Sequence, residues 1–414
     1  MNCSNCLDLT VRYCHATTRI DQPDNLPQKT GEKLENKNSE LEKEFFSAIK
    51  HGEVSAVRRF VADNPELLES YDYDYFGATP LTAVTFKDDR EMVEVLIELG
   101  VDVNRRSDWC MGPWSPLHSA IHSNKMDLVE YLLANGAEVD VHTAAALGRI
   151  EDLQRLLDEE PSRVNEQGGD GCQPLHFAGT KEAARLLLDR GADIEARCID
   201  HYSTPVQYLA PDRSEIARYL VAEGAQSDVF SAIISGDLAS VKKLIEKDAE
   251  VLDQRVNQKT FPPGPDHDVM NIMTFTVGPD ATPLHAAAIG NRPEMIELLI
   301  NAGMDPDIRG GYDDASALHQ AAWQDFLAAA ESLVQNGADI NIRSGEIHNN
   351  SPAGWAIVAG SADVFGFLMD SDADVLDFFA DDAQAAVDGA FREYKVVPQE
   401  NYVRIRDRLA TKLS

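Results

Sequence analysis

The chain has 414 residues, of which 43% are hydrophobic, and its 70 acidic side chains outnumber the 37 basic ones to give a formal net charge of −33. This charge argues against nucleic acid and anionic membranes as partners, because phosphate binding requires clustered Lys and Arg. No run of about eighteen apolar residues occurs, so the sequence predicts no membrane-spanning helix. A solvated acidic surface or a basic partner would each account for the charge.

The N-terminal residues 1–40 predict a disordered tail, because residues 21–38 are polar and contain few apolar side chains. Residues 1–20 lack the continuous apolar segment of a secretory signal. The six cysteines are too few and too irregularly spaced for a disulfide scaffold, which favours a reducing cytoplasm. Whether the tail binds metal stays open, since the residue types suit zinc but their spacing is unfamiliar. These residues are Cys3, Cys6, Cys14 and His15.

A short string recurs along the chain and predicts the start of a helix each time. A Ser or Thr hydroxyl can cap a helix whose first position suits proline. An apolar second helix and a glycine follow, and in four copies the glycine lies twenty residues after the proline position. A helix pair this small cannot bury its apolar face alone and must stack on its copies. The strings are Thr79-Pro80-Leu81, Ser115-Pro116-Leu117-His118, Gln173-Pro174-Leu175-His176, Thr204-Pro205-Val206, Thr282-Pro283-Leu284-His285 and Ser316-Ala317-Leu318-His319.

At these residues the chain resembles the ankyrin repeat family, whose signature is T-P-L-H-x-A with a period of about thirty-three residues. The resemblance covers about residues 41–376. It implies an all-α, ankyrin-type solenoid of about ten helix pairs, with β-turn fingers between repeats and a helical C-terminal cap. It also implies that the signature histidines bridge neighbouring repeats by hydrogen bonds; these are His118, His176, His285 and His319.

Three units lack the signature and begin near Phe45, Thr143 and Phe230. The second and third follow Gly136 and Gly224 so closely that we expect no finger at those two places. The interval from Pro174 to Gly191 is three residues short, which predicts a trimmed turn between the two helices. In the next unit Pro211 should end the first helix early.

The longest insertion covers residues 253–281 and has a proline-rich centre that excludes a helix there. Its second half predicts an extended hairpin arm. We therefore divide the chain into a tail (1–40), a solenoid (41–376) containing this insertion, and a C-terminal cap (377–414) whose helices would cover residues 383–394 and 401–413.

The sequence contains no phosphate-binding glycine loop, nucleophile elbow or zinc-protease motif, so we expect no enzyme, no cofactor and no metal site. His118 and His122 could contact one metal, but the signature role is the better interpretation of His118. The cluster at residues 266–268 lies in a proline-rich loop that would position a catalytic base poorly. Cys172 and Cys198 occupy finger positions of consecutive repeats and could come near each other, with no activating base in view.

Aromatic and Met side chains gather in the expected fingers and the insertion, where the fold has loops. Such residues are enriched at the centres of protein interfaces. Three alternatives stay open: partner binding, packing against one another, and a small-ligand pocket. The alternation from Tyr71 to Tyr75 predicts tyrosines on one face of an extended finger and aspartates on the other. The candidate partner-binding residues are Tyr71, Tyr73, Tyr75, Phe76, Trp109, Met111, Trp114, Phe261, Met270, Met273 and Phe275.

The function that we expect is a non-enzymatic scaffold or adaptor, monomeric, that binds a protein partner through fingers and first helices. The alternative is an acidic regulatory or inhibitory subunit, such as an antidote or nucleic-acid mimic, that blocks a basic site. An enzyme is the third hypothesis, for which the sequence offers no residues. A contiguous acidic stripe would favour the mimic, and acid spread over both faces would favour plain solubility.

Overall fold

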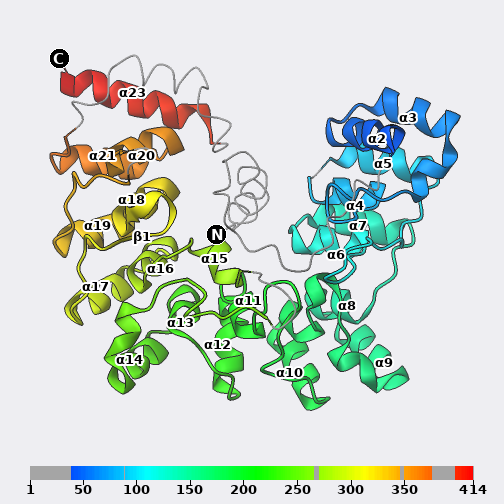
Figure 1. Ribbon diagram of the computed structural model, residues 1–414, viewed down its shortest axis with the longest axis horizontal. Helices are drawn as coiled ribbons and strands as arrows, with labels where there is room; N and C mark the ends of the chain where they lie inside the picture. Colours follow the sequence, from blue (N-terminus) through cyan, green and yellow to red (C-terminus); the bar gives the residue numbers. More distant parts are fainter. Residues whose placement is uncertain (1–38, 88, 265–269, 346–348, 375–396, 414) are drawn as a thin grey trace. The chain divides into compact units, whose positions relative to one another are not determined.

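The structure is a computed structural model that describes residues 39–87, 89–264, 270–345, 349–374 and 397–413 (Figure 1). The described residues are almost entirely helical. Their one sheet pairs β1 (Arg309–Gly310) with β2 (Ala315–Ser316) in antiparallel register. Internal contacts divide the chain into two compact units, residues 1–212 and 213–414, which we treat separately. The predicted all-α fold is confirmed.

Unit 1 contains successive pairs of short antiparallel helices joined by tight turns. The helices are α2 (Glu40–Lys50), α3 (Val54–Asp63), α4 (Pro80–Thr85), α5 (Arg90–Glu98), α6 (Pro116–His122), α7 (Met126–Ala134), α8 (Val141–Leu147), α9 (Ile150–Glu159), α10 (Lys181–Asp189) and α11 (Pro205–Leu209). Short 3-10 turns are η1 (Pro65–Glu69), η2 (Pro161–Asn165), η3 (Gly169–Gly171) and η4 (Pro174–Phe177).

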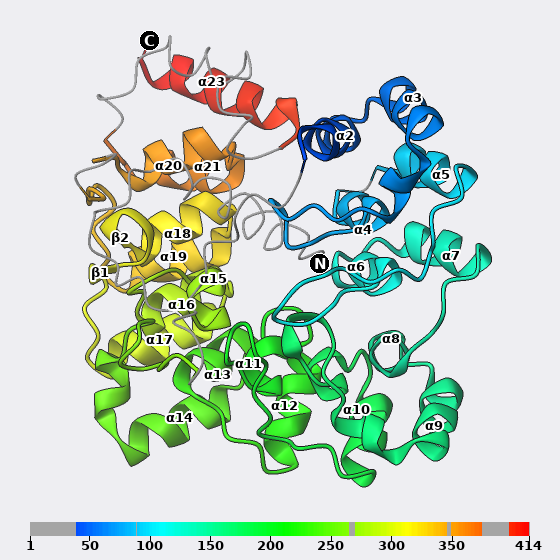
Figure 2. The same cartoon turned by 45° about the vertical axis from the view of Figure 1, so that its right-hand side comes forward.

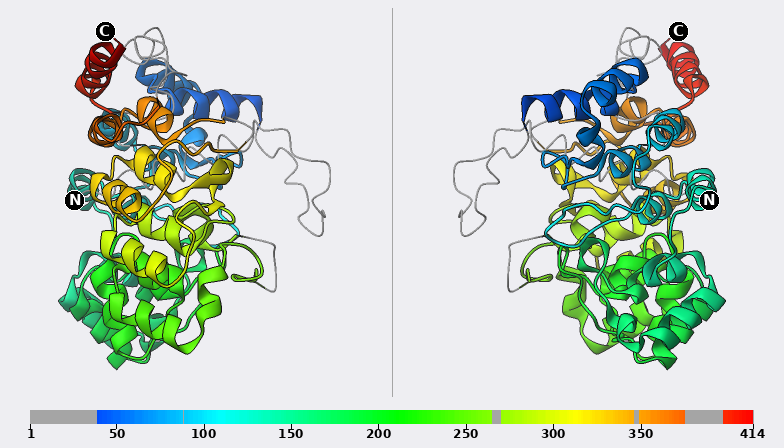
Figure 3. Two further views of the ribbon diagram at one scale, coloured as in Figure 1. Left: turned by 90° about the vertical axis from the view of Figure 1, so that its left-hand side faces the viewer. Right: turned by 90° about the vertical axis from the view of Figure 1, so that its right-hand side faces the viewer.

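Unit 2 continues the same order, and its helix pairs follow one another from green to red in Figures 2 and 3. Its helices are α12 (Ser214–Ala222), α13 (Val229–Ser235), α14 (Leu238–Lys247), α15 (Ile272–Thr276), α16 (Pro283–Ile289), α17 (Pro293–Asn301), α18 (Ala317–Gln324), α19 (Leu327–Gln335), α20 (Pro352–Ala359), α21 (Ala362–Asp370) and α23 (Gln399–Leu413), with the 3-10 turns η5 (Ala249–Asp253) and η6 (Tyr312–Asp314). If η4 is taken as the first helix before α10, and α15 and α23 are left unpaired, chain order gives ten helix pairs within the described residues, as predicted.

The caps expected from the recurrent string are present. The side chains of Thr79, Ser115 and Thr204 each accept a backbone N–H from the first turn of their helix, and a proline follows each of them. Leu284 on α16 is fully buried, as are Met295 and Leu299 on α17. The apolar faces of each pair are therefore covered by neighbouring repeats, as a stacked array requires.

A side-chain ladder links successive turns along both units. Asp or Asn side chains in one turn accept the backbone N–H of a residue about one repeat later, so each repeat orients the next. The acceptor and donor residues are Asn104 with Glu138, Asn165 with Asp193, Asp307 with Asp339, and Asn341 with Asp374, at 2.8–3.0 Å.

The two expected interruptions of the finger row are present. Only residues 135–140 separate α7 from α8, and only residues 223–228 separate α12 from α13. Helix α11 ends at Leu209, before Pro211, as predicted.

The prediction for the short repeat at Pro174 is wrong in detail. The missing residues come from the first helix, which is reduced to the single 3-10 turn η4. The connection between the two helices is not trimmed. The chain then passes so close to α8 that a side chain at Gly179 would collide with the Ala146 carbonyl oxygen. The Gly179 N–H donates to the Ala145 carbonyl at 2.9 Å, so η4 is held against α8 where a longer helix would not fit.

The expected hairpin arm in the insertion is also wrong. Residues 272–276 form α15, whose first turn is capped by the Asn271 side chain on the Met273 N–H at 3.0 Å. Burial of Met273 on the rest of unit 2 outweighs the extended preference of this apolar segment. The acid–histidine cluster 266–268 lies outside the described residues.

Helix α23 packs against α21 and covers the last repeat with Tyr402, Ile405 and Leu409. The Tyr402 hydroxyl donates to the Val358 carbonyl at 3.2 Å, and Arg404 pairs with Asp363 at 2.6 Å. This is the end cap that an open array needs to shield its terminal apolar face. The other predicted cap segment, 383–394, and residues 1–38 of the predicted N-terminal tail lie outside the described residues.

Candidate functional site

The eleven candidate partner-binding side chains fall into three classes of exposure. Phe76 and Met270 are exposed, at 45% and 48% of their surface. Trp114, Phe261 and Met273 are buried, so we leave these three out of any surface proposed for a partner. The remaining six are half-buried: Tyr71, Tyr73, Tyr75, Trp109, Met111 and Phe275.

The segment Tyr71–Tyr75 is a tight turn, so the expected alternation across an extended finger is wrong. Asp72 pairs with Ala78 across a single β-bridge, and Phe76 and Gly77 take positive φ angles. Asp72 is buried and its carboxylate forms an ion pair with Lys50 at 2.6 Å. The ion pair with Lys50 draws Asp72 inward and fixes the turn, and the alternation of Tyr and Asp in the sequence could not indicate this contact.

Most aromatic side chains of this finger pack on neighbours within unit 1. The Phe76 and Trp109 rings meet edge-on with centroids 4.9 Å apart. The Tyr73 hydroxyl donates to Asp108 at 2.7 Å. This hydrogen bond, together with burial, raises the pKa of Tyr73 to about 12. The Arg105 guanidinium lies 4.8 Å from the centre of the Tyr71 ring. The self-packing alternative therefore describes much of this region.

Trp114 is the centre of an unbroken series of ring contacts along unit 1. It is 6% exposed and lies between α4, α6 and η4. The series continues through Phe177, whose ring centroid lies 5.5 Å from that of Tyr208 on α11. The rings next to Trp114 belong to Phe86, His118, His122 and Phe177, at centroid distances of 4.6–6.1 Å. His118 and His122 thus pack on an indole.

The Trp114 indole also holds a polar cluster at the next finger. Its N–H donates to the Asp170 carboxylate at 2.9 Å, and the Asp170 carbonyl accepts the N–H groups of Ile199 and Asp200. Burial raises the pKa of Asp170 to about 6, and the nearby Asp200 carboxylate adds to the increase. The His201 imidazole lies 3.5 Å from Asp200 and acts in the opposite direction on Asp170. This cluster joins the fingers of two successive repeats.

Three of the four signature histidines have the role that the resemblance implied. The Nε2 of His176, His285 and His319 lies 2.9–3.1 Å from a backbone carbonyl oxygen one repeat later, which it can reach by donating its proton. Their Nδ1 atoms accept backbone N–H groups of the N-cap residues. Burial lowers the pKa of all three to about 4, so they are neutral at pH 7.

His118 is the exception, and the prediction for it is wrong. Its Nε2 has no hydrogen-bond partner among the described residues, because no finger follows α7 to supply the carbonyl. The bridge is made one repeat later by His142, whose Nε2 lies 2.9 Å from the Glu166 carbonyl oxygen. His142 stacks on His118 at 5.9 Å. Sequence inspection missed His142 because it follows Val141, outside the signature string.

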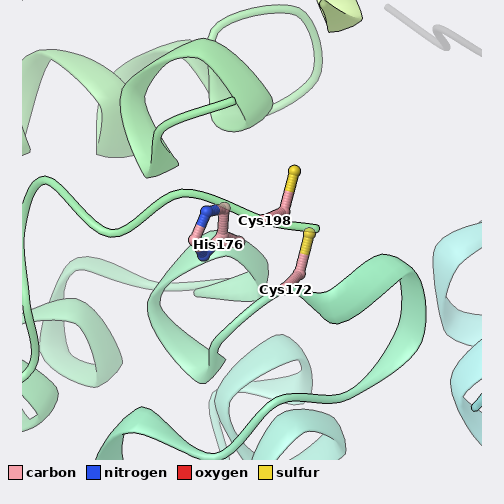
Figure 4. Close-up of side chains that lie close together, drawn as sticks. All are labelled: Cys172, His176 and Cys198. Atoms are coloured by element: carbon pink, nitrogen blue, oxygen red, sulfur yellow. The ribbon is translucent and has the colours of Figure 1, made fainter. Parts of the chain in front are cut away.

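Cys172 and Cys198 are brought together from consecutive fingers, with His176 beside them (Figure 4). Both thiols are buried, and the ligand atoms of the three residues lie within 4.8 Å of one another. Such a set could hold zinc by residue type. However, both ring nitrogens of His176 already make the hydrogen bonds of a signature histidine, so we assign no metal site here.

A pair of tryptophans in unit 2 escaped the sequence analysis. Trp323 on α18 and Trp355 on α20 are half-buried, and their ring centroids lie 5.8 Å apart on the first helices of consecutive repeats. Trp355 also meets the buried His319 ring at 5.2 Å, which fixes its position. Both lie on first helices, outside the fingers and the insertion that the sequence marked as aromatic-rich.

Many acidic side chains are used locally. Asp102, Asp193 and Asp339 each accept the N–H two residues later and so form the turns between repeats. Others pair with arginines, as Glu98 does with Arg58 at 2.5 Å. Turns and ion pairs therefore account for part of the acidic charge.

Across the described ranges, none of the helices combines the length and the apolar character that crossing a bilayer requires.

Comparison with known families gives one match. The family described as ankyrin repeats (3 copies) matches residues 45–143 and 229–344, together just over half of the chain. The stretch between the two matched ranges contains η4, α10, α11 and α12, where the repeats are irregular.

Known relatives share low identity. Transient receptor potential cation channel subfamily A member 1 of Homo sapiens is 23% identical over 330 residues, which is 72% of this chain and 27% of that protein. Alpha-latrocrustotoxin-Lt1a of Latrodectus tredecimguttatus is 26% identical over 118 residues, 26% of this chain and 8% of the toxin. The protein YahD of Escherichia coli (strain K12), described by its name as an ankyrin repeat protein, is 26% identical over 204 residues, 45% of this chain and 98% of YahD. The chain thus spans only a minor part of the first two.

Proposed function

The chain belongs to the ankyrin repeat family, and we propose that it acts as a non-enzymatic scaffold that binds a protein partner through the first helices of unit 2. Ankyrin repeats are protein-interaction modules, and the rigid stack of capped helix pairs is suited to presenting side chains in fixed positions. Fold alone does not identify a partner. The proposal therefore depends on a specific surface feature.

The observation that carries the proposal is the indole pair of Trp323 and Trp355. Tryptophan is enriched among the residues that contribute most to binding, because it buries a large area with few rotatable bonds. The two rings are half-buried and edge-on, and Trp355 is braced by His319. Little conformational freedom remains to be lost when a partner covers them.

The charge of the chain supports a basic partner. A net charge of −33 would accelerate the approach of a cationic protein and should make the association rate fall as salt is added. Exposed Phe76 in unit 1 and Met270 in unit 2 are further proposed contact points, together with half-buried Trp109 and Met111. We also propose that the protein is monomeric and cytoplasmic.

The acidic inhibitor is not carried forward as a second function. The described acidic side chains often serve turns, helix caps and ion pairs, and no observation favours a contiguous acidic stripe. An enzyme is likewise not proposed, because the two groups of potential metal ligands found among the described residues make contacts inside the array.

Affinity capture with quantitative mass spectrometry tests the proposal. The tagged full chain should retain a set of proteins from cell extract at low salt, and less of them at high salt. The double variant W323A/W355A should lose this set. The matched control Met126→Ala, which truncates a side chain 47% exposed on α7, should retain it. Equal capture by all three proteins would contradict the proposal.

A further inference from the structure

The unusual repeat of unit 1 places two buried thiols against each other. Cys172 follows η3 in one finger, and Cys198 lies in the next finger, before α11. Their Sγ atoms lie within 4.8 Å of each other, and the two side chains are 0% and 1% exposed. Figure 4 shows both sulfur atoms on the same side, away from the nitrogen atoms of His176.

The two cysteines have different environments. The Cys198 sulfur accepts the backbone N–H of Ser203 at 3.4 Å, while its own N–H donates to the Ser203 carbonyl at 3.1 Å. The Cys172 thiol and the backbone of His201 also favour the charged form of this sulfur and so lower its pKa. Burial and the negative charges of Asp170 and Asp200 disfavour a thiolate on Cys172. Hydrogen-bond donors around one sulfur stabilise its thiolate, which is the nucleophilic form.

We propose that Cys172 and Cys198 form a redox-active dithiol that a hydroperoxide converts to a disulfide between neighbouring fingers. This modification site is independent of partner binding by unit 2. The pKa values agree with Cys198 as the thiol that attacks the peroxide and Cys172 as the thiol that then closes the disulfide. Donation from Cys172, against the effect of burial, lowers the pKa of Cys198 to about 7, whereas burial raises that of Cys172.

The chemistry balances in two steps. The Cys198 thiolate attacks one peroxide oxygen; an S–O bond forms, the O–O bond breaks and hydroxide or alkoxide leaves, which gives a sulfenic acid. The Cys172 sulfur then attacks the Cys198 sulfur; an S–S bond forms, the S–O bond breaks, and the thiol proton leaves with the hydroxyl as water. The sulfur pair loses two electrons and the peroxide gains them. Residues 199–202, which follow Cys198 directly in the chain, are half-buried.

A zinc site is the competing use of the same thiols. Zinc in proteins normally takes four ligands. The nearest third donor, His176, holds the Gln173 N–H on Nδ1 and is bonded through Nε2 to the Ser203 carbonyl. His285 makes the same pair of bonds, and none of the described cysteines is among the groups that shift its pKa, so the repeat alone explains the position of His176. The structure therefore favours the dithiol.

The test uses the full chain with Cys3, Cys6, Cys14 and Cys110 replaced by Ser, so that only the pair remains. It is treated with hydrogen peroxide at pH 7, alkylated, digested and analysed by mass spectrometry. We expect a cross-linked Cys172–Cys198 peptide that dithiothreitol releases, and a higher melting temperature after oxidation. The variant Cys172→Ser in this background should form no cross-link and should accumulate a sulfenic acid on Cys198 that dimedone traps.

Two results would overturn the proposal. In the unsubstituted chain, oxidation of exposed Cys110 while Cys172 and Cys198 stay reduced would show that the pair is unreactive. Stoichiometric zinc in the purified protein, lost on Cys198→Ser, would assign the thiols to a metal instead. Circular dichroism of each variant establishes that the repeats are folded, and the cross-link in the unsubstituted chain provides the readout that needs no variant.

Discussion

Units 1 and 2 use the same repeat in different ways. In unit 2 the signature histidines His285 and His319 bridge successive repeats, and the first helices carry an indole pair that is left half-buried. In unit 1 the first helices are joined by a series of ring contacts around Trp114, and His118 makes no bridge through Nε2. His118 is packed against the rings of Trp114 and Phe177 instead, and His142 makes the bridge one repeat later.

This difference separates two roles for aromatic residues that look alike in sequence. Trp114 supports its own unit, because a hydrogen bond to Asp170 and four neighbouring rings enclose it. Trp323 and Trp355 contact each other and leave part of their surface to solvent. A comparison of stability and binding in the two units can therefore test the account, beginning with the largest expected effect.

Leu284→Asp should have the largest effect. The side chain is fully buried on α16, which packs against α13 and α18, and an unpaired carboxylate there should cost more than about 5 kcal/mol. Urea denaturation should show the loss, and hydrogen exchange should place it in α13, α16 and α18. The control Met270→Asp at an exposed site should change stability by less than about 0.5 kcal/mol. Slow exchange throughout α16 in the variant would contradict the stacking assigned to unit 2.

Trp114→Ala should come next and should affect unit 1. Truncation of a core aromatic side chain costs about 3–5 kcal/mol. Trp109→Ala, at a half-buried side chain of the neighbouring finger, should cost about 1 kcal/mol because it removes mainly the contact with Phe76. Chemical denaturation of the two variants measures the difference. Equal losses of unfolding free energy in the two variants would contradict the central packing role assigned to Trp114.

Acid should destabilise both units through their histidines. With pKa values of about 4 in the folded state and about 6.5 when unfolded, His176 in unit 1 and His285 and His319 in unit 2 bind protons only in the unfolded state between these limits. Stability should therefore fall as pH falls from 6.5 to 4, by up to about 1.4 kcal/mol per pH unit for each histidine. His319→Gln should show a shallower dependence than the unsubstituted chain, in urea titrations at pH 7, 6 and 5.

In unit 1 the Asp170 carboxyl group should contribute a pH dependence of stability opposite to that of the histidines. The pKa of Asp170 is about 6 when folded and 3.8 as the ordinary value, so between these limits the folded state binds the proton more strongly. This contribution strengthens unit 1 as pH falls toward 4, and Asp170→Asn should remove it. An identical pH dependence for Asp170→Asn and the unsubstituted chain would mean that the carboxyl group is not enclosed.

Tyr73→Phe should have the smallest effect. It removes the hydrogen bond to Asp108 in a half-buried finger, which should cost about 0.5 kcal/mol. The same bond predicts one tyrosine that titrates near pH 12 in an ultraviolet absorbance titration, and this transition should vanish in the variant. A variant with an unchanged titration would contradict the Tyr73–Asp108 contact.

The sequence was informative wherever local chemistry determines structure. The recurrent Thr-Pro-Leu or Ser-Pro-Leu strings located first helices at Pro80, Pro116 and Pro283, and Pro211 marked the early end of α11. The capping hydroxyl, the proline and the terminal glycine act within a single turn, so no distant contact can easily override them.

The sequence was uninformative where a contact with another repeat determines the local conformation or the burial of a side chain. Asp72 turns inward because Lys50 of the preceding repeat meets it, and η4 stays short because α8 approaches Gly179. Trp114 is buried and Trp109 is half-buried although both lie in the same finger, since Trp114 reaches Asp170 of a later repeat. The proximity of Cys172 and Cys198 was foreseen as an option, but the hydrogen bonds that distinguish them depend on the turn at Ser203.

The most direct test of the account is hydroxyl-radical footprinting of the four tryptophans in the folded chain, read by mass spectrometry. Trp323 and Trp355 should be oxidised readily, Trp109 to a similar degree, and Trp114 only after denaturant unfolds unit 1. Addition of a captured partner should protect Trp323 and Trp355. Rapid labelling of Trp114, with Trp323 and Trp355 inert both before and after the partner is added, would contradict the assignment of packing to unit 1 and binding to unit 2.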